Sequence, residues 1–275
     1  MYLIEFDYCF IYQQSIKSGI ESLMIFTTAL LSTILSTVSN DAPKHAVCLY
    51  TACPIVIDGK LEDTSWRKAR WINDFVDIEG SHKPKPYLRT RVKLLWDDEY
   101  LYVGAELQEP HVWGNYTARS SPLFLENNFE VFIDPDSDRK DYFEFEVNAL
   151  GTIWDLMLTH PYKEGGKGIN LNNPNIKVAV QVDGTINEPC DTDKSWSVEL
   201  AIPWKMMAEK AGRITPPKPG DTWRMNLVRT EWPFEIVDGK YQKPKDSQSN
   251  FWVWSPQGAI NMHLPEKWGY VEFKR

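Results

Sequence analysis

Residues Phe129–Pro135 read Phe-Glu-Val-Phe-Ile-Asp-Pro, and a similar run, Tyr-Phe-Glu-Phe-Glu-Val-Asn, occupies Tyr142–Asn148. Both runs alternate apolar with polar residues, which is the period-2 pattern of a β-strand with one buried face. The alternation therefore predicts two strands of one sheet. The residues predicted to face the core are Phe129, Val131, Ile133, Phe143, Phe145 and Val147.

The opposite face of the same two strands carries polar groups. These are Glu130, Glu144, Glu146 and Asn148, in a chain with 12 Trp and 12 Tyr. Carboxylates and an amide can hydrogen-bond sugar hydroxyls while aromatic rings stack on the sugar. The pattern therefore indicates a carbohydrate-binding face.

Composition narrows the range of partners. The 275 residues include 38 acidic and 30 basic side chains, for a formal net charge of -8. Nucleic acid or an anionic membrane surface would call for a concentrated basic patch, and the sequence has no such run. With 43% hydrophobic residues, the chain can build a sizeable core.

The amino-terminal region contains one apolar run, Leu23–Leu35. At about 13 residues it is shorter than a membrane-spanning helix of ~20 and has the length of a signal-peptide core. We expect residues 1–39 to be a signal peptide, with a mis-started prefix if translation begins at Met24. The alternative is an uncleaved amphipathic anchor. The domain at 40–275 is then exported, either periplasmic or secreted, with no membrane span.

The rest of the chain shows roughly ten short alternating segments and little helix. Helical turns are expected after Asp63 and at Lys205–Ala211. This arrangement is typical of an all-β protein rather than an α/β enzyme fold. We predict one antiparallel two-sheet β-sandwich, jelly-roll-like, with short helical turns.

The ordered set of motifs resembles the family 9 carbohydrate-binding modules. That resemblance implies a β-sandwich that binds saccharides without transforming them, by clamping a sugar between two aromatic rings. The motifs that carry it are Ile57–Leu61 with Trp66, Leu95–Asp97 with Tyr100–Val103, Glu130–Asp134, Glu199–Trp204, and Trp254-Ser-Pro with Gly269–Phe273.

The resemblance also implies site residues. The two clamping rings match Phe124 and Trp254, although each residue could instead pack in the core. Polar contacts would come from Glu130, Glu144, Glu146 and Asn148. Some members carry a basic residue where this chain has Glu146. Trp113, just past Glu109-Pro110, is a third candidate ring.

A metal site is also considered at Asp134, Asp136 and Asp138. Closely spaced carboxylates suit Ca²⁺, and the resemblance allows a structural calcium. The same run is equally typical of an Asp-rich hairpin turn. No other cofactor is expected.

Two rival functions remain open. Paired carboxylates such as Glu130 and Glu146 can hydrolyse glycosides, and similar sandwiches bind haem. Haem would need axial ligands, for which the candidates are Met157, Met225, Met262 and His263. We predict instead a non-enzymatic protein that binds a saccharide or polysaccharide, with glycoside hydrolases acting on the same substrate as partners in polysaccharide breakdown or uptake.

Overall fold

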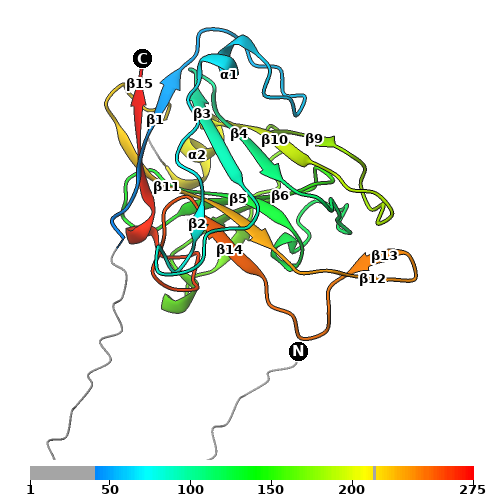
Figure 1. Ribbon diagram of the computed structural model, residues 1–275. Coiled ribbons are helices and arrows are strands. Elements are labelled where there is room, and N and C mark those ends of the chain that lie inside the picture. The colour runs from blue at the N-terminus through cyan, green and yellow to red at the C-terminus, as the bar shows by residue number, and fades with distance from the viewer. Residues whose placement is uncertain (1–40, 213–214) are drawn as a thin grey trace, which may run out of the picture. The chain divides into compact units, whose positions relative to one another are not determined.

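The computed structural model describes residues 41–212 and 215–275 (Figure 1). The expected signal peptide at residues 1–39 lies outside the described residues. In the part that is described, no helix has both the length and the apolar character needed to cross a membrane.

The described chain is mostly β-strand, with a few short helices. In chain order the elements are β1 (His45–Tyr50), α1 (Thr64–Lys68), β2 (Val76–Asp77), β3 (Thr90–Trp96), β4 (Tyr100–Gln108), η1 (Leu123–Leu125), β5 (Asn128–Asp134), β6 (Tyr142–Asn148), β7 (Ile153–Leu158), η2 (Tyr162–Glu164), β8 (Gly168–Asn170), β9 (Lys177–Asp183), β10 (Ser195–Pro203), α2 (Trp204–Ala211), β11 (Thr222–Glu231), β12 (Glu235–Val237), β13 (Lys240–Gln242), β14 (Asn250–Val253), η3 (Pro265–Lys267) and β15 (Gly269–Lys274).

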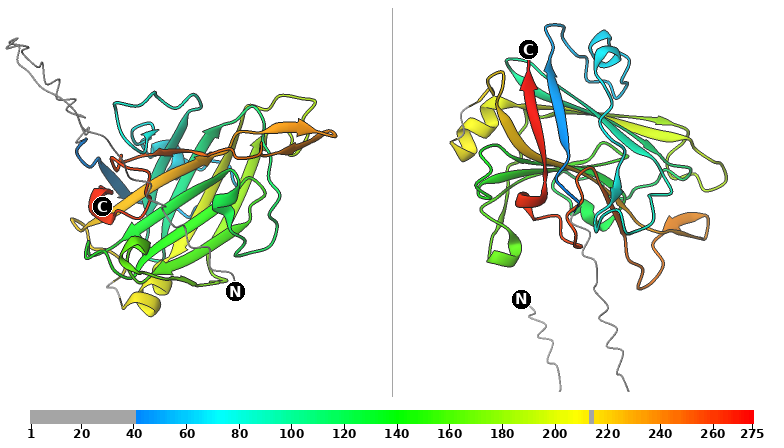
Figure 2. Two further views of the ribbon diagram at one scale, coloured as in Figure 1. Left: turned by 90° about the horizontal axis from the view of Figure 1, so that it is seen from below. Right: turned by 60° about the vertical axis from the view of Figure 1, so that its left-hand side comes forward.

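The main sheet is continuous and curls so that its two halves face each other. Its strand order is β8-β7-β6-β5-β11-β15-β1-β3-β4-β10-β9; in addition, β14 pairs with β11, and β2 pairs with β14. Strands β15 and β1 connect the halves where the sheet turns over (Figure 2). The expectation of two separate sheets is therefore corrected to one curled sheet, with β12 and β13 forming a small ribbon of their own.

The expectation of purely antiparallel pairing is wrong at β1. This strand pairs in parallel with β15 on one side and with β3 on the other. Parallel neighbours need a long connection, and residues 51–89 between β1 and β3 supply it. The alternation of each strand predicted the strands themselves but carried no information about their direction.

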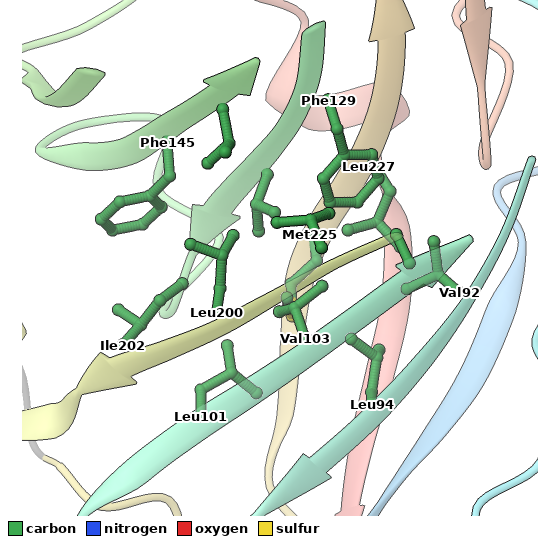
Figure 3. Packing of buried hydrophobic residues seen from close by; sticks show 14 of the residues in the cluster. Val92, Leu94, Leu101, Val103, Phe129, Phe145, Leu200, Ile202, Met225 and Leu227 are labelled. Carbon is green, nitrogen blue, oxygen red and sulfur yellow. The ribbon is translucent and has the colours of Figure 1, made fainter. Parts of the chain in front are cut away.

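The core lies between the facing halves of the sheet (Figure 3). Val131, Phe145 and Leu227 contribute from one half, and Val103 and Leu200 from the other. The inward faces predicted for β5 and β6 are confirmed, since all six predicted residues belong to this core. Packing at this interface fixes which face of β5 and β6 points away from the core.

The outward face of β5 and β6 is also covered, and every residue of both strands is buried. A second apolar cluster lies on this side. It includes Phe132, Tyr142, Leu156 and Trp268, with Phe251 packed against it. The polar groups predicted on this face therefore lie in a sheltered environment and not on an open surface.

Candidate functional site

A pocket of about 420 Å³ opens on the outward face of β5, β6 and β7. The strands form its floor, and aromatic and apolar side chains form its walls. The walls come from η1, η2, β14 and the segment before η3. The lining residues are Phe124, Glu130, Glu144, Glu146, Trp154, Leu156, Tyr162, Phe251, Ile260, Asn261, Met262 and His263.

Strand register brings three carboxyl groups together on this floor. Glu130 lies opposite Glu146, and Glu146 lies opposite Trp154. Glu144, two residues before Glu146, points to the same face because strand side chains alternate. The structure thus gathers three of the predicted polar residues, and their exposed fractions are only 2–5%.

Burial changes the protonation of these groups. Loss of hydration raises the pKa of Glu130 to about 7. Burial, followed by repulsion from neighbouring carboxylates, raises the pKa of Glu144 and Glu146 well above the ordinary value. An ionised carboxylate is costly to bury without a positive partner. The three groups therefore hold protons at pH values where a solvated glutamate would be ionised.

The hydrogen bonds to this floor are few. The hydroxyl of Thr230 donates to Glu130 Oε1 at 2.6 Å, and Asn128 Nδ2 donates to Glu146 Oε2 at a longer 3.4 Å. Within the described chain, Glu144 Oε2 is buried and faces no donor. Glu144 and Glu146 share a hydrogen bond only when one of them carries a proton. The floor therefore has unused hydrogen-bonding capacity.

Two rings form one wall of the pocket. Phe124, 46% exposed, stacks on Trp154 with ring centroids 5.9 Å apart and an interplanar angle of 29°. The Trp154 indole is held from its other edge, because its Nε1 donates to Asn170 Oδ1 at 2.8 Å. Aromatic faces beside hydrogen-bond acceptors suit a pyranose ring, which presents apolar C–H faces and polar edges.

The loop that carries Phe124 is fastened by residues next to the β12–β13 ribbon. Trp232 Nε1 donates to the Phe124 carbonyl at 3.0 Å, and Lys243 Nζ donates to the Leu125 carbonyl. The Lys243 ammonium also lies 3.8 Å above the centre of the Trp232 ring. These contacts position Phe124 from outside the pocket.

His263 lies at the opposite wall. Its Nδ1 is 3.0 Å from the Tyr142 hydroxyl, and its ring packs edge-on against Phe132 and Tyr162. Burial lowers the pKa of His263 to about 4. The imidazole is therefore neutral near pH 7 and adds no positive charge to the pocket.

Three residues predicted at the site lie elsewhere. Trp254 is fully buried in the main core, where Gly269 leaves room for its ring, since a Cβ there would come within 2.4 Å of it. Trp113 is buried and stacks on Tyr241. Asn148 is also buried and closes the β6–β7 turn, its Oδ1 accepting from the Thr152 backbone N–H at 2.9 Å.

Trp154 and Phe251 were not among the predicted site residues, although the sequence held a signal for each. Trp154 lies on β7, the next strand after the one that carries Glu146. Antiparallel pairing of β6 with β7 places the two residues opposite each other, so both point to the same face. Phe251 alternates with Trp252 and Trp254, so it points to the opposite face of this segment. Trp252 and Trp254 pack in the main core, whereas Phe251 packs against the second apolar cluster and lines the pocket.

The predicted metal residues do come together at the turn after β5. Ligand oxygens of Asp134, Asp136 and Asp138 all lie within 4.8 Å of one another. Asp134 is buried and accepts the backbone N–H groups of Ser137 and Arg139 at 3.1 and 3.0 Å. That pattern matches the Asp-rich turn, and the spacing of the oxygens also fits a calcium ion. Calcium binding here stays a prediction.

The four candidate haem ligands lie in two different places. Met262 and His263 line the pocket, whereas Met225 is buried in the main core and Met157 packs against that core. The structure therefore divides these four residues between the pocket and the main core.

A family model for the carbohydrate family 9 binding domain-like proteins matches residues 57–274. The match covers nearly all of the described chain. The chain belongs to this family. The resemblance predicted from the sequence motifs is thereby confirmed, and so is the prediction of a non-catalytic protein, since the family consists of carbohydrate-binding modules.

Curated relatives of this family 9 domain are much longer proteins. An exoglucanase of Acetivibrio thermocellus is 28% identical over 159 residues, which is 58% of this chain and 12% of the relative. An endo-1,4-beta-xylanase of Paenibacillus barcinonensis is 36% identical over 101 residues, which is 37% of this chain and 8% of the relative. The chain thus spans about an eighth or less of the relatives' length.

Solved structures share the fold of this family 9 domain. A candidate carbohydrate-binding protein of Bacteroides uniformis superposes with a TM-score of 0.62 at 16% identity, over 85% of this chain and all of that one. A family 9 module of Caldicellulosiruptor kristjanssonii bound to cellotriose gives 0.51 at 18% identity, over 84% and 94%. The same module was also solved with glucose.

Proposed function

We propose that the pocket on the outward face of β5, β6 and β7 binds a saccharide. The observation that carries this proposal is the placement of the stacked Phe124–Trp154 pair beside the buried carboxyl groups of Glu130, Glu144 and Glu146. A sugar ring seated against the aromatic wall would direct its hydroxyls at the floor. Trp254, Trp113 and Asn148 take no part, because their side chains are buried elsewhere.

The family relatives support the ligand class. The Caldicellulosiruptor module binds glucose and cellotriose, and two of the curated relatives are named as an exoglucanase and an endo-1,4-beta-xylanase. We infer a ligand drawn from polysaccharide chains. Export of the domain, and glycoside hydrolases acting on the same polysaccharide, complete the proposed role in polysaccharide breakdown or uptake.

The expected affinity for a single sugar is modest. Each hydroxyl exchanges a bond with water for a bond with protein, so its net contribution is only about 0.5–1.5 kcal/mol. Bonds to an ionised carboxylate contribute more. Several ring and hydroxyl contacts together would therefore be needed for tight binding.

Titration calorimetry against a panel of oligosaccharides tests the proposal. Trp154→Ala should abolish binding of any saccharide that the wild-type domain takes. Trp71→Ala is the matched control, because Trp71 is also a half-buried indole but lines a separate groove beside β1. Binding that survives Trp154→Ala and is lost in Trp71→Ala would move the site to that groove.

A further inference from the structure

The pocket is unusual in its charge. Its floor holds three carboxyl groups, and none of the described residues that line it is a lysine or an arginine. The one imidazole, that of His263, is neutral near pH 7. The charged groups that act on Glu144 and Glu146 are other carboxylates. With a neutral sugar bound, these carboxyl groups would stay protonated, whereas a bound cation would allow them to ionise.

Glu144 has a buried oxygen without a hydrogen-bond partner in the described structure. Its side chain is 95% buried and lines the pocket, and its Oε2 has no hydrogen-bond donor in the described structure. Buried polar atoms are nearly always paired, and an unpaired acceptor costs about 1–3 kcal/mol. The pocket therefore presents a buried oxygen that a polar group of the ligand would satisfy, and when Glu144 is ionised that group must be a donor.

A metal ion fits the floor poorly. The described acidic group whose oxygens all converge within 4.8 Å is the Asp134 cluster at the strand turn, not the three glutamates. The walls are aromatic and apolar, which suits an organic cation rather than a hydrated ion. A cation bound in this pocket would therefore be an organic one rather than a metal ion.

We propose that the preferred ligand is a saccharide with a protonated amine, that is, a 2-amino sugar without its N-acetyl group. This inference rests on the proposed function, and it names the substrate class of the same site. An ammonium group has three N–H donors and no acceptor. One of those donors would reach the unpaired Oε2 of Glu144, with the other carboxyl groups of the floor nearby, while the pyranose ring lies against Phe124 and Trp154.

Binding of the ammonium has a proton signature. A nearby positive charge favours the ionised form of a carboxyl group, so protons held by the three glutamates are released when the amine binds. The other titratable groups facing them are Tyr162 and His263 on the walls and Tyr142 beside Glu144. Burial, and then repulsion from neighbouring carboxylates, raises the pKa values of Tyr142 and Tyr162, so neither ionises near pH 7.

Calorimetry at pH 5.5, where the free amine is already protonated, with three matched trisaccharides tests the inference. These are β-1,4-linked glucosamine, its fully N-acetylated form, and cellotriose. The glucosamine trimer should bind at least about tenfold tighter than either neutral trimer, since charge-assisted hydrogen bonds are roughly twice as strong as neutral ones. Titrations in two buffers of different ionisation enthalpy should show net proton release for the amine alone.

A variant pair localises the effect. Glu144→Gln removes one ionisable group while keeping the side chain's size, and it should weaken binding of the glucosamine trimer more than it weakens binding of cellotriose. Glu62→Gln, at an exposed position, is the control. If Glu144→Gln does not fold, the comparison of trimers on the wild-type domain still decides the matter.

The outcomes separate the two proposals. Equal affinity for the three trimers, or a preference for a neutral one, would overturn the amine inference and leave saccharide binding intact. Absence of binding to any oligosaccharide in the panel would overturn the proposed function itself. Tighter amine binding that persists unchanged in Glu144→Gln, with no proton release, would show that the glutamate floor is not its cause.

Discussion

Glu130 and Glu146 lie directly opposite each other on β5 and β6, and both side chains are almost completely buried. Like charges at facing positions of a sheet repel, and burial removes the water that would screen them. The pair is compatible with the fold because at least one carboxyl group keeps its proton. Stability and ligand affinity are therefore both linked to pH through this floor.

We expect the free energy of unfolding to fall as the pH rises above neutral. Glu144 and Glu146 carry this decline, because burial raises their folded pKa values well above the ordinary value and their contribution is lost as pH rises through those values. Glu130, with a folded pKa of about 7 against 4.5 in the unfolded chain, contributes on the order of 3 kcal/mol that is lost between these two pH values, so only the end of its loss falls within the range of the melts. Thermal melts of the wild type from pH 6.5 to 9 should show a declining Tm.

Glu146→Gln isolates this effect. Its Tm should decline less than that of the wild type, with a gap that widens as pH rises, while exposed Glu62→Gln should follow the wild type. His263 acts in the other direction, since its lowered pKa makes stability rise with pH between about 4 and 6.5. The melts therefore begin above that range. Parallel curves for Glu146→Gln and the wild type would contradict the assignment.

Sequence alternation could predict the floor of this pocket but not its walls. The period-2 pattern fixes that Glu130, Glu144 and Glu146 share a face, because side chains in a strand can point only two ways. It does not say what covers that face. Phe251 and His263 arrive from more than 100 residues further along the chain.

Alternation also cannot predict which aromatic ring reaches the pocket. Trp254 and Phe251 point to opposite faces of one segment, and only the packing of distant residues decides which face meets the main core and which meets the pocket. A motif shared with the family marks Trp254 but cannot distinguish a ring that packs in the core from one that contacts ligand. Phe124 was found because its loop immediately precedes the strand that supplies the floor.

Lys243 should affect ligand affinity without touching the ligand. Its ammonium donates to the Leu125 carbonyl and lies over Trp232, whose indole holds the Phe124 carbonyl. Lys243→Met removes the donor but keeps an apolar stem. We expect saccharide affinity to weaken roughly threefold to tenfold, the equivalent of one net hydrogen bond.

Lys240→Met, on β13 of the same ribbon but exposed, is the matched control and should leave affinity unchanged. Hydrogen exchange at residues 123–126 distinguishes a positioning role from a general loss of stability. Faster exchange confined to that segment is expected for Lys243→Met. Unchanged exchange with unchanged affinity would remove Lys243 from the account.

Glu199 connects a family motif to stability rather than to binding. Its Oε2 accepts the backbone N–H groups of Asp58 and Gly59 at 2.8 and 2.7 Å, and its Oε1 accepts from Trp66 Nε1 at 2.6 Å. Gly59 has φ +87°, and a Cβ there would lie 2.6 Å from the Val180 backbone. The residues that marked the family in the sequence thus fasten the segment before α1 onto β10.

Replacing Glu199 with Gln turns one acceptor oxygen into an N–H₂ group that faces N–H donors. Leaving a buried donor unpaired costs about 1–3 kcal/mol, and that is the destabilisation expected in chemical denaturation.

Glu106→Gln, on neighbouring β4, is the control. It breaks a surface ion pair with Arg91 and should cost less than about 1 kcal/mol. Saccharide affinity should be unchanged in both, because β4 and β10 belong to the half of the sheet that does not form the pocket. A loss of affinity in Glu199→Gln with wild-type stability would instead place Glu199 at a binding surface.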